Sequence, residues 1–590
     1  MSKRGAQLFI KLAEFLDRRW GWDNLPPTLG LLSLVGIRNR LREDNLFDTY
    51  DGRPPAAPAR EPHEYLTVRT VDGSYNDLSA PSMGMAGTRF GRNLRPDSAP
   101  AEQPPRLFDP NPMTISTELL RRETFKGAGQ VNVLAAAWLQ FEVHDWFSHG
   151  TTTDRMIEVP RPAGYEWPTD PVRVPATPDD PTASGDTASK TYLNVDSHWW
   201  DGSQIYGSTV AAQEAVRSGE SGKLTIDDDG FIGSNPSPQD PFLTNEGWWL
   251  GLELLTTLFM NEHNAICDKL AAAYPRWSDD VLFEKARLVN TALITKIHTL
   301  EWTPALLGHP ALEQGMRGNW FGAAGERVKR LAGRLSSSDF ISGIPGSATD
   351  HHAAPYSVTE EFVTVYRMHP LLPDDFGFVA LDGNPSLSCA FDDIRSAQSR
   401  GALEKVGQGN AMYTFGISEA GALALHNSPR FMQRFDRLDS VTIDLNAVDV
   451  LRSRERGVPR YNDFRESLRL PRARSFEEIS RGSLETAEKL RHIYGDIDQV
   501  DTVVGMYGER LPRGFAFGET AFRIFVLMAT RRLKSDRFYS VDFTPRIYTP
   551  EGMAWVDDND MTSVLARHHP ELAPALRGQG NVFLRWKPLR

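Results

Sequence analysis

The side chains of this 590-residue sequence that best suit chemistry are two histidines and a tyrosine in apolar settings. Tyr366 and His369 lie three residues apart, immediately before Pro370. Ser357 and Glu360 have the spacing of a capping box and the proline forbids continuation, so we expect a three-turn helix with Tyr366 and His369 on one face. Taken alone, the pair would be a core tyrosine beside a hydrogen-bonded histidine.

The second histidine changes that interpretation. His144 lies in a stretch from 131 to 147 that is apolar almost all round, which is typical of a buried helix. Gln140 lies one turn earlier on the same face, and an unsatisfied buried polar group costs about 1–3 kcal/mol. The two side chains therefore need a partner, which is another side chain, a water or a cofactor. A haem fits two histidines on remote helices, with His369 as axial ligand and His144 as an acid–base group for peroxide.

A glycine-containing turn offers oxygen ligands of the kind that a hard cation takes. Ser197, Asp201 and Ser203 bring hydroxyl and carboxylate oxygens at spacings of four and two residues. Asp145, next to His144, would complete such a site from another segment. A plain turn is the alternative, because Asp, Ser and Gly also favour turns in their own right.

Composition limits the classes of function. The net charge is -12 and the pI about 5.7, without a long basic stripe, so nucleic acid is not an expected partner. Cys267 and Cys389 are the only cysteines, too few for a disulfide framework. Without CxxC, HExxH, GxGxxG or Walker patterns, zinc-hydrolase, Rossmann and P-loop chemistries are disfavoured. The amino-terminal segment is too charged for a signal peptide and no apolar run approaches the ~20 residues of a membrane span, so we expect a cytoplasmic protein.

The spacing of apolar residues predicts a mainly α protein with long loops and little β structure. Residues 1–50 are predicted to form amphipathic helices, either packed on the body of the protein or lying at a membrane surface. Residues 51–110 are rich in proline and are expected to be irregular, while residues 111–590 are expected to form one large catalytic domain of a monomeric protein. Further helices are predicted at 248–270, 281–300, 396–407, 417–426, 476–493 and 517–534.

Five motifs occur in an order that is specific, although each motif is weak alone. They are Gln140-x-x-x-His144-Asp145, Asp201-Gly202-Ser203-x-x-Tyr206-Gly207-Ser208, Glu262-His263-Asn264, Tyr366-Arg367-Met368-His369-Pro370-Leu371 and Arg452-Ser453-Arg454-Glu455-Arg456-Gly457-Val458-Pro459-x-Tyr461-Asn462. In these motifs the chain resembles the animal-type haem peroxidase and cyclooxygenase superfamily. From about residue 5 to 572 it is most similar to the fatty-acid α-dioxygenases.

The resemblance implies a single large cyclooxygenase-like helical domain that binds haem. His144 matches the distal haem histidine and Gln140 its neighbour on that side. His369 matches the proximal ligand of the haem iron, and Tyr366 the tyrosine that becomes a radical.

Two further sites are implied by the same resemblance. A calcium site is expected at Asp145, Ser197, Trp199 through its carbonyl, Asp201 and Ser203, with Ser197 standing where threonine is common. The substrate carboxylate is expected to bind His298, Thr303 and an arginine. Arg532 is the best match for that arginine, with Arg531 and Arg546 as the alternatives.

Two stretches depart from relatives in the superfamily. In mammalian peroxidases a Glu-Met pair cross-links the haem, with an arginine just upstream, but residues 245–249 read Asn-Glu-Gly-Trp-Trp. We therefore expect non-covalent haem b and weak halide or general peroxidase activity. Asp449 stands where an asparagine often hydrogen-bonds the proximal histidine. It would orient His369 and increase its electron donation, or it is a solvated aspartate on a loop.

The implied activity is α-oxygenation of a long-chain fatty acid. Activation by a peroxide would leave Tyr366 as a radical that removes a hydrogen atom from carbon 2, and O2 would add there to give the 2-hydroperoxy acid. Charge-assisted hydrogen bonds of about 1.5–3 kcal/mol each would hold the carboxylate deep in the pocket and so select carbon 2. The alternatives are a haem peroxidase and a cyclooxygenase-like mid-chain oxygenase. A non-enzymatic haem or lipid carrier would need neither the distal pair nor the tyrosine.

Overall fold

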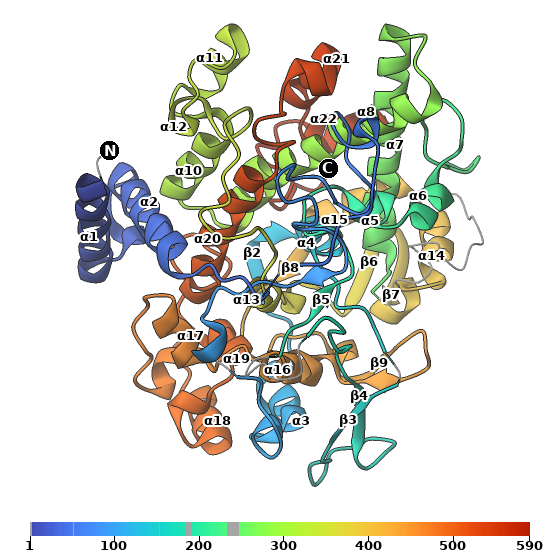
Figure 1. The fold of residues 1–590 in the computed structure, drawn as a ribbon. Coiled ribbons are helices and arrows are strands. Elements are labelled where there is room, and N and C mark those ends of the chain that lie inside the picture. The colour runs from blue at the N-terminus through green and yellow to red at the C-terminus, as the bar shows by residue number, and fades with distance from the viewer. Residues whose placement is uncertain are drawn as a thin grey trace.

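Helices build the body of the protein, and the strands are short (Figure 1). The computed structural model describes residues 3–50, 52, 54–98, 100–152, 154–183, 190–232 and 247–589. Within these ranges the strands pair only in two-stranded antiparallel sheets, so the prediction of a mainly α protein with little β structure is confirmed.

The α-helices are α1 (Lys3–Trp20), α2 (Pro27–Asp44), α3 (Pro112–Ile115), α4 (Val133–Trp146), α5 (Ser203–Tyr206), α6 (Val210–Val216), α7 (Leu250–Ala273), α8 (Asp279–Ile297), α9 (Thr303–Leu306), α10 (Pro310–Phe321), α11 (Gly325–Ala332), α12 (Asp339–Ser342), α13 (Glu360–Val365), α14 (Gln398–Val406), α15 (Gln408–Ile417), α16 (Leu445–Glu455), α17 (Tyr461–Ser467), α18 (Leu484–Tyr494), α19 (Thr502–Gly508), α20 (Glu519–Ser535), α21 (Pro545–Asp558), α22 (Met561–His568) and α23 (Ala573–Leu576). The strand pairs are β1 (Thr88–Arg89) with β5 (Leu193–Asn194), β2 (Gly127–Asn132) with β8 (Glu419–Gly421), β3 (Met156–Val159) with β4 (Val172–Pro175), β6 (Asp375–Val379) with β7 (Pro385–Ala390), and β9 (Phe435–Asp436) with β10 (Thr442–Ile443). Strands β3, β4 and β9 lie near the lower edge in Figure 1, whereas β2, β8 and β5 lie near the middle.

Helix α4 lies at the centre of the body. Asn132 caps it, because its side chain accepts a hydrogen bond of 3.1 Å from the backbone N–H of Ala135. The helix packs against α5, α7 and α15, and α7 packs in turn against α8. Most α4 side chains are buried, as the apolar sequence predicts, so its few polar groups face a cavity or other buried groups.

The helix before His369 is shorter than predicted. Thr359, and not Ser357, caps α13, since the Thr359 side chain accepts the hydrogen bond from the third residue of the helix. His369 opens a separate 3-10 turn. Pro370 disfavours the α conformation in the residue before it, which explains why α13 ends before it reaches the histidine.

Four of the other predicted helices, at 248–270, 281–300, 396–407 and 517–534, appear as α7, α8, α14 and α20 with shifted ends. The helix predicted at 417–426 is wrong, because the chain there forms β8 and a turn. A Cβ at Gly421 would lie 1.9 Å from the carbonyl oxygen of Pro370, so the glycine allows this strand to pass the histidine turn closely. The helix predicted at 476–493 is a 3-10 turn followed by α18, which starts only after Gly482 at a φ of 84°.

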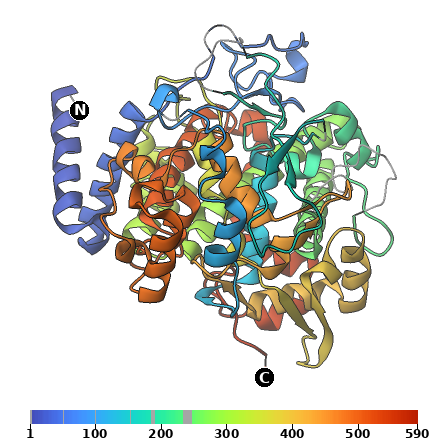
Figure 2. The same ribbon diagram turned by 90° about the horizontal axis from the view of Figure 1, so that it is seen from below.

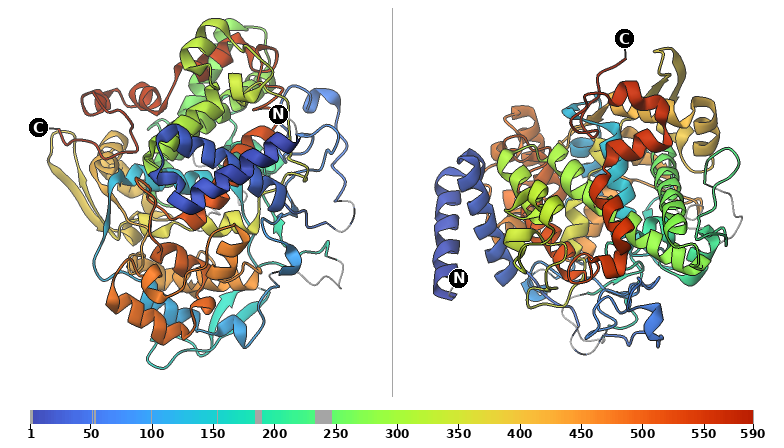
Figure 3. Two further views of the ribbon diagram at one scale, coloured as in Figure 1. Left: turned by 90° about the vertical axis from the view of Figure 1, so that its left-hand side faces the viewer. Right: turned by 90° about the horizontal axis from the view of Figure 1, so that it is seen from above.

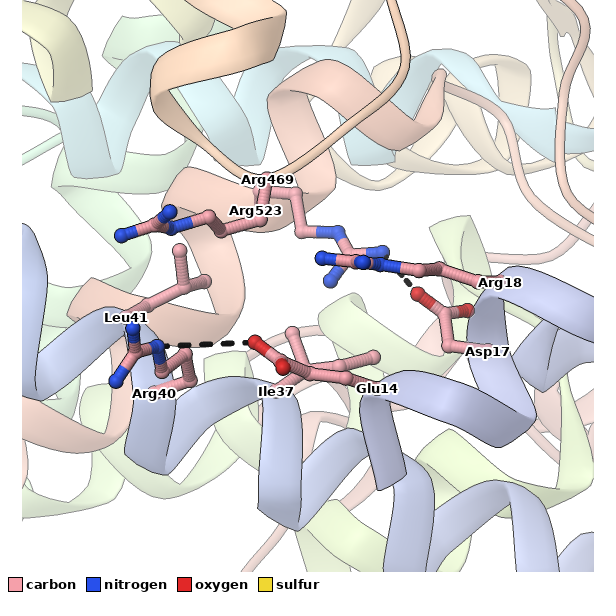
Figure 4. A pocket seen from close by; sticks show the side chains of 8 residues that line it. All are labelled: Glu14, Asp17, Arg18, Ile37, Arg40, Leu41, Arg469 and Arg523. Carbon is pink, nitrogen blue, oxygen red and sulfur yellow. Dashed lines mark hydrogen bonds and ion pairs between the residues drawn. The ribbon is translucent and has the colours of Figure 1, made fainter. Parts of the chain in front are cut away.

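Helices α1 and α2 form a hairpin at the edge of the body (Figure 2; Figure 3, right). An ion pair fastens it to the body, because Asp17 on α1 lies 2.6 Å from Arg523 on α20. Within the hairpin, Arg40 on α2 forms a partly exposed pair with Glu14 on α1 at 3.7 Å (Figure 4). The indole N–H of Trp22 donates to Glu519 of α20. The hairpin is therefore packed on the body, which was one of the two arrangements predicted for residues 1–50.

The proline-rich segment after the hairpin is irregular in its described parts, with β1 and short 3-10 turns as its regular elements. Among the helices of the described ranges, none combines the length and the apolar composition needed to cross a membrane.

Candidate active site

A cavity of about 300 Å³ lies between α4 and the turn that follows α13. Gln140 and His144 line it from α4, and Tyr366 and His369 line it from the turn. Most of the remaining wall is apolar and includes Leu139, Val143, Leu371, Phe391, Phe431 and Met432. Two arginines, Arg395 and Arg437, also line the cavity. The fold thus brings onto one cavity both histidines and the tyrosine that the sequence singled out.

Asp449 orients His369. The Nδ1–H of His369 donates to Asp449 Oδ2 at 2.8 Å, which leaves Nε2 as the nitrogen available to a metal. Asp449 lies on α16 and is only 8% exposed, so the alternative of a solvated aspartate on a loop is wrong. A carboxylate bonded to a ligating imidazole makes the ring a stronger donor.

The opposite wall holds Gln140 in one orientation. The Gln140 side-chain oxygen accepts a hydrogen bond of 2.8 Å from the indole N–H of Trp249, and its amide nitrogen donates to the backbone oxygen of Gly247 at 3.0 Å. Burial lowers the pKa of His144 to about 4, so this imidazole is neutral at neutral pH and able to accept a proton. Of the stretch expected to lack the haem cross-link, Asn245 and Glu246 lie outside the described residues.

A π-helical turn, His298–Trp302, brings His298 and Thr303 to one face. The backbone N–H of Thr303 bonds to the carbonyl of His298, five residues earlier, which is the spacing of a π-helix. Both side chains are buried, and Thr303 Oγ1 has no hydrogen-bond partner among the described residues. His298 Nδ1 accepts a hydrogen bond of 3.2 Å from the indole N–H of Trp138, so the ring proton is on Nε2.

Arg532 lies among the aromatic rings next to this turn. Its guanidinium carbon is 4.2 Å from the ring centre of Trp146 and 4.6 Å from that of Trp200. Arg532 is 2% exposed, and neither its Nε nor its Nη2 has a partner within the described part of the chain. Arg531 instead donates to backbone carbonyls, and the Arg546 side chain is 71% exposed beside Asp542. Of the three candidate arginines, only Arg532 is buried with two guanidinium nitrogens that have no partner among the described residues.

Tyr366 lies between the cavity and this polar cluster. Its ring centre is 5.2 Å from the ring centre of Trp146. The Trp146 ring also contacts His298, with ring centres 5.2 Å apart. The Tyr366 ring also contacts Phe362 at 4.5 Å. Burial raises the pKa of the Tyr366 phenol, so the side chain is neutral at physiological pH.

The predicted calcium ligands meet in a buried site. Asp145 Oδ1 accepts from the backbone N–H of Ser203 at 2.6 Å, and Ser197 Oγ donates to Asp201 Oδ2 at 2.8 Å. Asp145 Oδ2 and Asp201 Oδ1 are buried without a partner among the described residues. Arg287 Nη2 lies 3.6 Å from Asp201 Oδ2, whereas Asp145 has no ion-pair partner among the described residues. Burial and Asp201 raise the pKa of Asp145 to about 8.

Trp199 lies in the same turn, its ring stacked on Tyr356 with centres 4.5 Å apart. In the part of the chain that the structure describes, no three His, Cys, Asp or Glu side chains gather as metal ligands. A cation at this turn would therefore depend on two carboxylates together with hydroxyl and carbonyl oxygens, which is a hard-cation donor set.

Comparisons with known proteins identify the family of the chain. Residues 68–583 match the family model of the animal haem peroxidases. The chain is 36% identical to alpha-dioxygenase PIOX of Oryza sativa subsp. japonica, over 97% of this chain and 94% of that protein. It is also 36% identical to alpha-dioxygenase 1 of Capsicum annuum, over 98% of this chain and 92% of the relative. The crystal structure of Oryza sativa fatty acid alpha-dioxygenase matches 100% of this chain and 97% of its own, with 34% identity and a TM-score of 0.91.

The chain belongs to the fatty-acid α-dioxygenases of the animal haem peroxidase family. The predicted family, fold and enzyme class are therefore confirmed. A crystal structure of Oryza sativa fatty acid alpha-dioxygenase with palmitic acid is also similar to this chain, with 34% identity and a TM-score of 0.91.

Sequence reasoning missed several residues of this enzyme's site. Trp146 and Trp200 form the aromatic walls around Arg532, and Arg395 and Arg437 line the large cavity. Glu142 was also missed, although a carboxyl on a mainly apolar helix was a visible signal. It is buried beside His298, with Oε1 3.6 Å from His298 Nδ1.

Proposed function

We propose that this enzyme uses a radical on Tyr366 to remove a hydrogen atom from carbon 2 of a long-chain fatty acid, where O2 then adds to give the 2-hydroperoxy acid. The observation that supports this is the position of Tyr366. Its ring lines the cavity of His369 and, on its other side, meets the Trp146 ring that also contacts His298 and Arg532.

The cavity has the donors and walls that non-covalent haem b requires. His369 would hold the iron through Nε2, and Arg395 and Arg437 would pair with the haem carboxylates. When bound, the haem supplies the one-electron oxidation of Tyr366 after activation by a peroxide. His144, neutral and on the opposite wall, takes a proton from the peroxide and returns it. Gln140 stays beside it because Trp249 and Gly247 fix its amide.

The choice of carbon follows from how the acid is held. Arg532 Nε and Nη2, Thr303 Oγ1 and the Nε2–H of His298 are donors that a carboxylate would satisfy together. Trp146 contacts both Tyr366 and Arg532, so a carboxylate bound to Arg532 would lie close to Tyr366. Carbon 2, which is attached to the carboxylate, would then be the first carbon that the tyrosine can reach. A mid-chain oxygenase would need the carboxylate far from the tyrosine, and these donors disfavour that alternative.

Product analysis tests the proposal. Incubation of the haem-loaded enzyme with palmitate and O2 should give the 2-hydroperoxy acid, with the 2-hydroxy acid and the shortened aldehyde as its breakdown products. The Tyr366→Phe variant should retain the haem absorbance band and lose O2 uptake. Products oxygenated at mid-chain, or unchanged oxygenation by the variant, would contradict the assignment.

We propose further that calcium occupies the turn around Asp145. Two buried carboxylate oxygens, Asp145 Oδ2 and Asp201 Oδ1, have no hydrogen-bond partner in the part of the chain that the structure describes, and they support a cation there. The hydroxyls of Ser197 and Ser203 and the carbonyl of Trp199 would complete its shell. Because Asp145 follows His144 on α4, the ion would also fix the end of the helix that carries the distal histidine.

We propose finally that the α1–α2 hairpin rests on a lipid surface, where a fatty acid is available. Leu8, Leu12 and Phe15 are 70%, 54% and 58% exposed on one face of α1, and Leu29 and Leu32 are exposed on α2. Exposed Lys11, Arg18 and Arg19 flank this face and complement anionic headgroups.

A further inference from the structure

Glu142 is a buried carboxyl that points away from the large cavity. It precedes His144 by two residues, and two residues on an α-helix turn the side chain to the opposite face. Glu142 is 0% exposed; its Oε2 accepts a hydrogen bond of 2.9 Å from the indole N–H of Trp200. Its Oε1 has no hydrogen-bond partner in the described part of the chain and lies 3.6 Å from His298 Nδ1.

An ion pair between Glu142 and His298 is excluded by the hydrogen bond from Trp138. An indole N–H can only donate, so His298 Nδ1 at 3.2 Å is an acceptor and carries no proton toward Glu142. Burial and the nearby Arg532 hold the pKa of His298 well below its usual value, so the ring is neutral. The carboxyl therefore has no cationic partner in the histidine.

The groups around Glu142 favour its protonated form. His298 faces it from the π-helical turn and is neutral, Tyr366 faces it from the end of α13 as a neutral phenol, and Asp145 follows it on α4. Arg532 on α20 is the one cationic side chain that acts on it among the described residues, and the calcium proposed at Asp145 would oppose the contribution of that carboxylate. Burial, with a smaller contribution from Asp145, raises the pKa of Glu142 well above its usual value despite Arg532.

A fatty-acid carboxylate bound to Arg532, His298 and Thr303 would lie beside this carboxyl. Two carboxyl groups that share one buried cation cannot both be ionised without strong repulsion. With Glu142 protonated, Arg532 is free for the substrate. With Glu142 ionised, its negative charge would act on Arg532 through space, without a direct ion pair between these two described residues, and would repel the incoming acid.

We propose that Glu142 is a positioning residue that makes fatty-acid binding depend on one proton: the substrate carboxylate binds only when Glu142 is protonated. This inference rests on the proposed carboxylate site. Above the pKa of Glu142 in the free enzyme, binding has to take up a proton, so KM rises about tenfold for each further pH unit. The rate kcat is unaffected, because Glu142 is already protonated in the enzyme–substrate complex.

The experiment measures O2 uptake with submicellar dodecanoate, whose own carboxyl is ionised throughout, from pH 6.5 to 9.5. For the unmodified enzyme we expect constant kcat and a KM that is flat and then rises with pH. For Glu142→Gln, whose amide mimics the protonated acid, KM should stay flat over the whole range. Glu301→Gln is the matched control: burial raises the pKa of Glu301 to about 8, but its Oε1 accepts from the backbone of Met561, away from Arg532, and the rise of KM should persist.

An unchanged KM profile in Glu142→Gln, or a flat profile in the unmodified enzyme, would overturn the proposal. If the glutamine variant does not fold, Glu142→Met serves in its place, with the same expected flat profile. Calorimetric titration of the unmodified enzyme with dodecanoate in two buffers of different ionisation enthalpy gives an independent answer. It should show uptake of about one proton per acid at the alkaline end, and no uptake there would also refute the inference.

The two proposals fail differently. If product analysis finds no oxygenation at carbon 2, the proposed function fails while the calorimetric result still decides on Glu142. If the 2-hydroperoxy acid forms and the KM of Glu142→Gln keeps its pH dependence, only the role of Glu142 is wrong.

Discussion

Replacing Thr303 by valine should stabilise the free enzyme and weaken its binding of substrate. Thr303 is 0% exposed, and its Oγ1 has no hydrogen-bond partner in the described ranges. Valine has nearly the same shape and removes the unsatisfied hydroxyl. Because such a buried group costs about 1–3 kcal/mol, we expect the free energy of unfolding to rise by about that amount at most.

The effect on substrate has the opposite sign. If Thr303 donates to the carboxylate, the variant loses a hydrogen bond to a charged group, worth about 1.5–3 kcal/mol. This corresponds to an increase in KM of about 10- to 150-fold. The chemical step should change little, because the hydroxyl touches the carboxylate and not carbon 2.

Urea unfolding of the free enzyme and O2 uptake with a soluble fatty acid measure the two effects separately. Thr295→Val is the matched control, because Thr295, two turns earlier and equally buried, donates its hydroxyl to Tyr539 at 3.0 Å. That variant should lose stability and keep its KM. A Thr303→Val enzyme that is less stable than the unmodified one, with unchanged KM, would refute the assignment of Thr303 to the carboxylate site.

Three other predictions follow from the structure. Asp449→Ala removes the 2.8 Å bond from His369 and should weaken haem binding about 10- to 100-fold in a titration followed by visible absorbance; undiminished affinity would contradict the orienting role. Without calcium, the pKa of the Asp145 carboxyl is about 8 in the folded chain and 3.8 in the unfolded chain. The free energy of unfolding in EGTA should therefore fall as pH rises between these values, and added calcium should remove that fall. Leu12→Glu with Phe15→Glu should reduce cosedimentation with anionic phospholipid vesicles while leaving O2 uptake on a soluble acid intact; undiminished sedimentation would exclude the hairpin face.

The parts of the site that lie on one regular element could be predicted from the sequence. Gln140 and His144 are one turn apart on α4, and the helical period alone places both on the cavity. Tyr366 and His369 also share the cavity, although α13 ends at Val365, before both, and His369 starts a separate 3-10 turn. The error at 417–426 arose where a close approach to Pro370, and not local preference, decides the conformation.

Other contacts depended on geometry that a spacing rule cannot supply. On a regular α-helix His298 and Thr303 would point about 140° apart, so no argument from helical period pairs them. The π-helical turn aligns them, and only the resemblance to relatives indicated the pair. The contact of Asp449 with His369 joins distant segments, and the sequence left a solvated loop as an equal alternative.

In the proposed carboxylate site, the arrangement of unpaired atoms would select a carboxylate and not merely a long alkyl chain. Arg532 Nε and Nη2 and Thr303 Oγ1 are buried without partners among the described residues. Each costs stability in the free enzyme, and that cost is relieved only by a ligand that accepts several hydrogen bonds at once. A fatty alcohol of the same chain length would bury the same apolar surface but leave the charge of Arg532 uncompensated. A site built on such donors discriminates against the analogue that lacks the acceptor far more strongly than an apolar channel discriminates by one methylene.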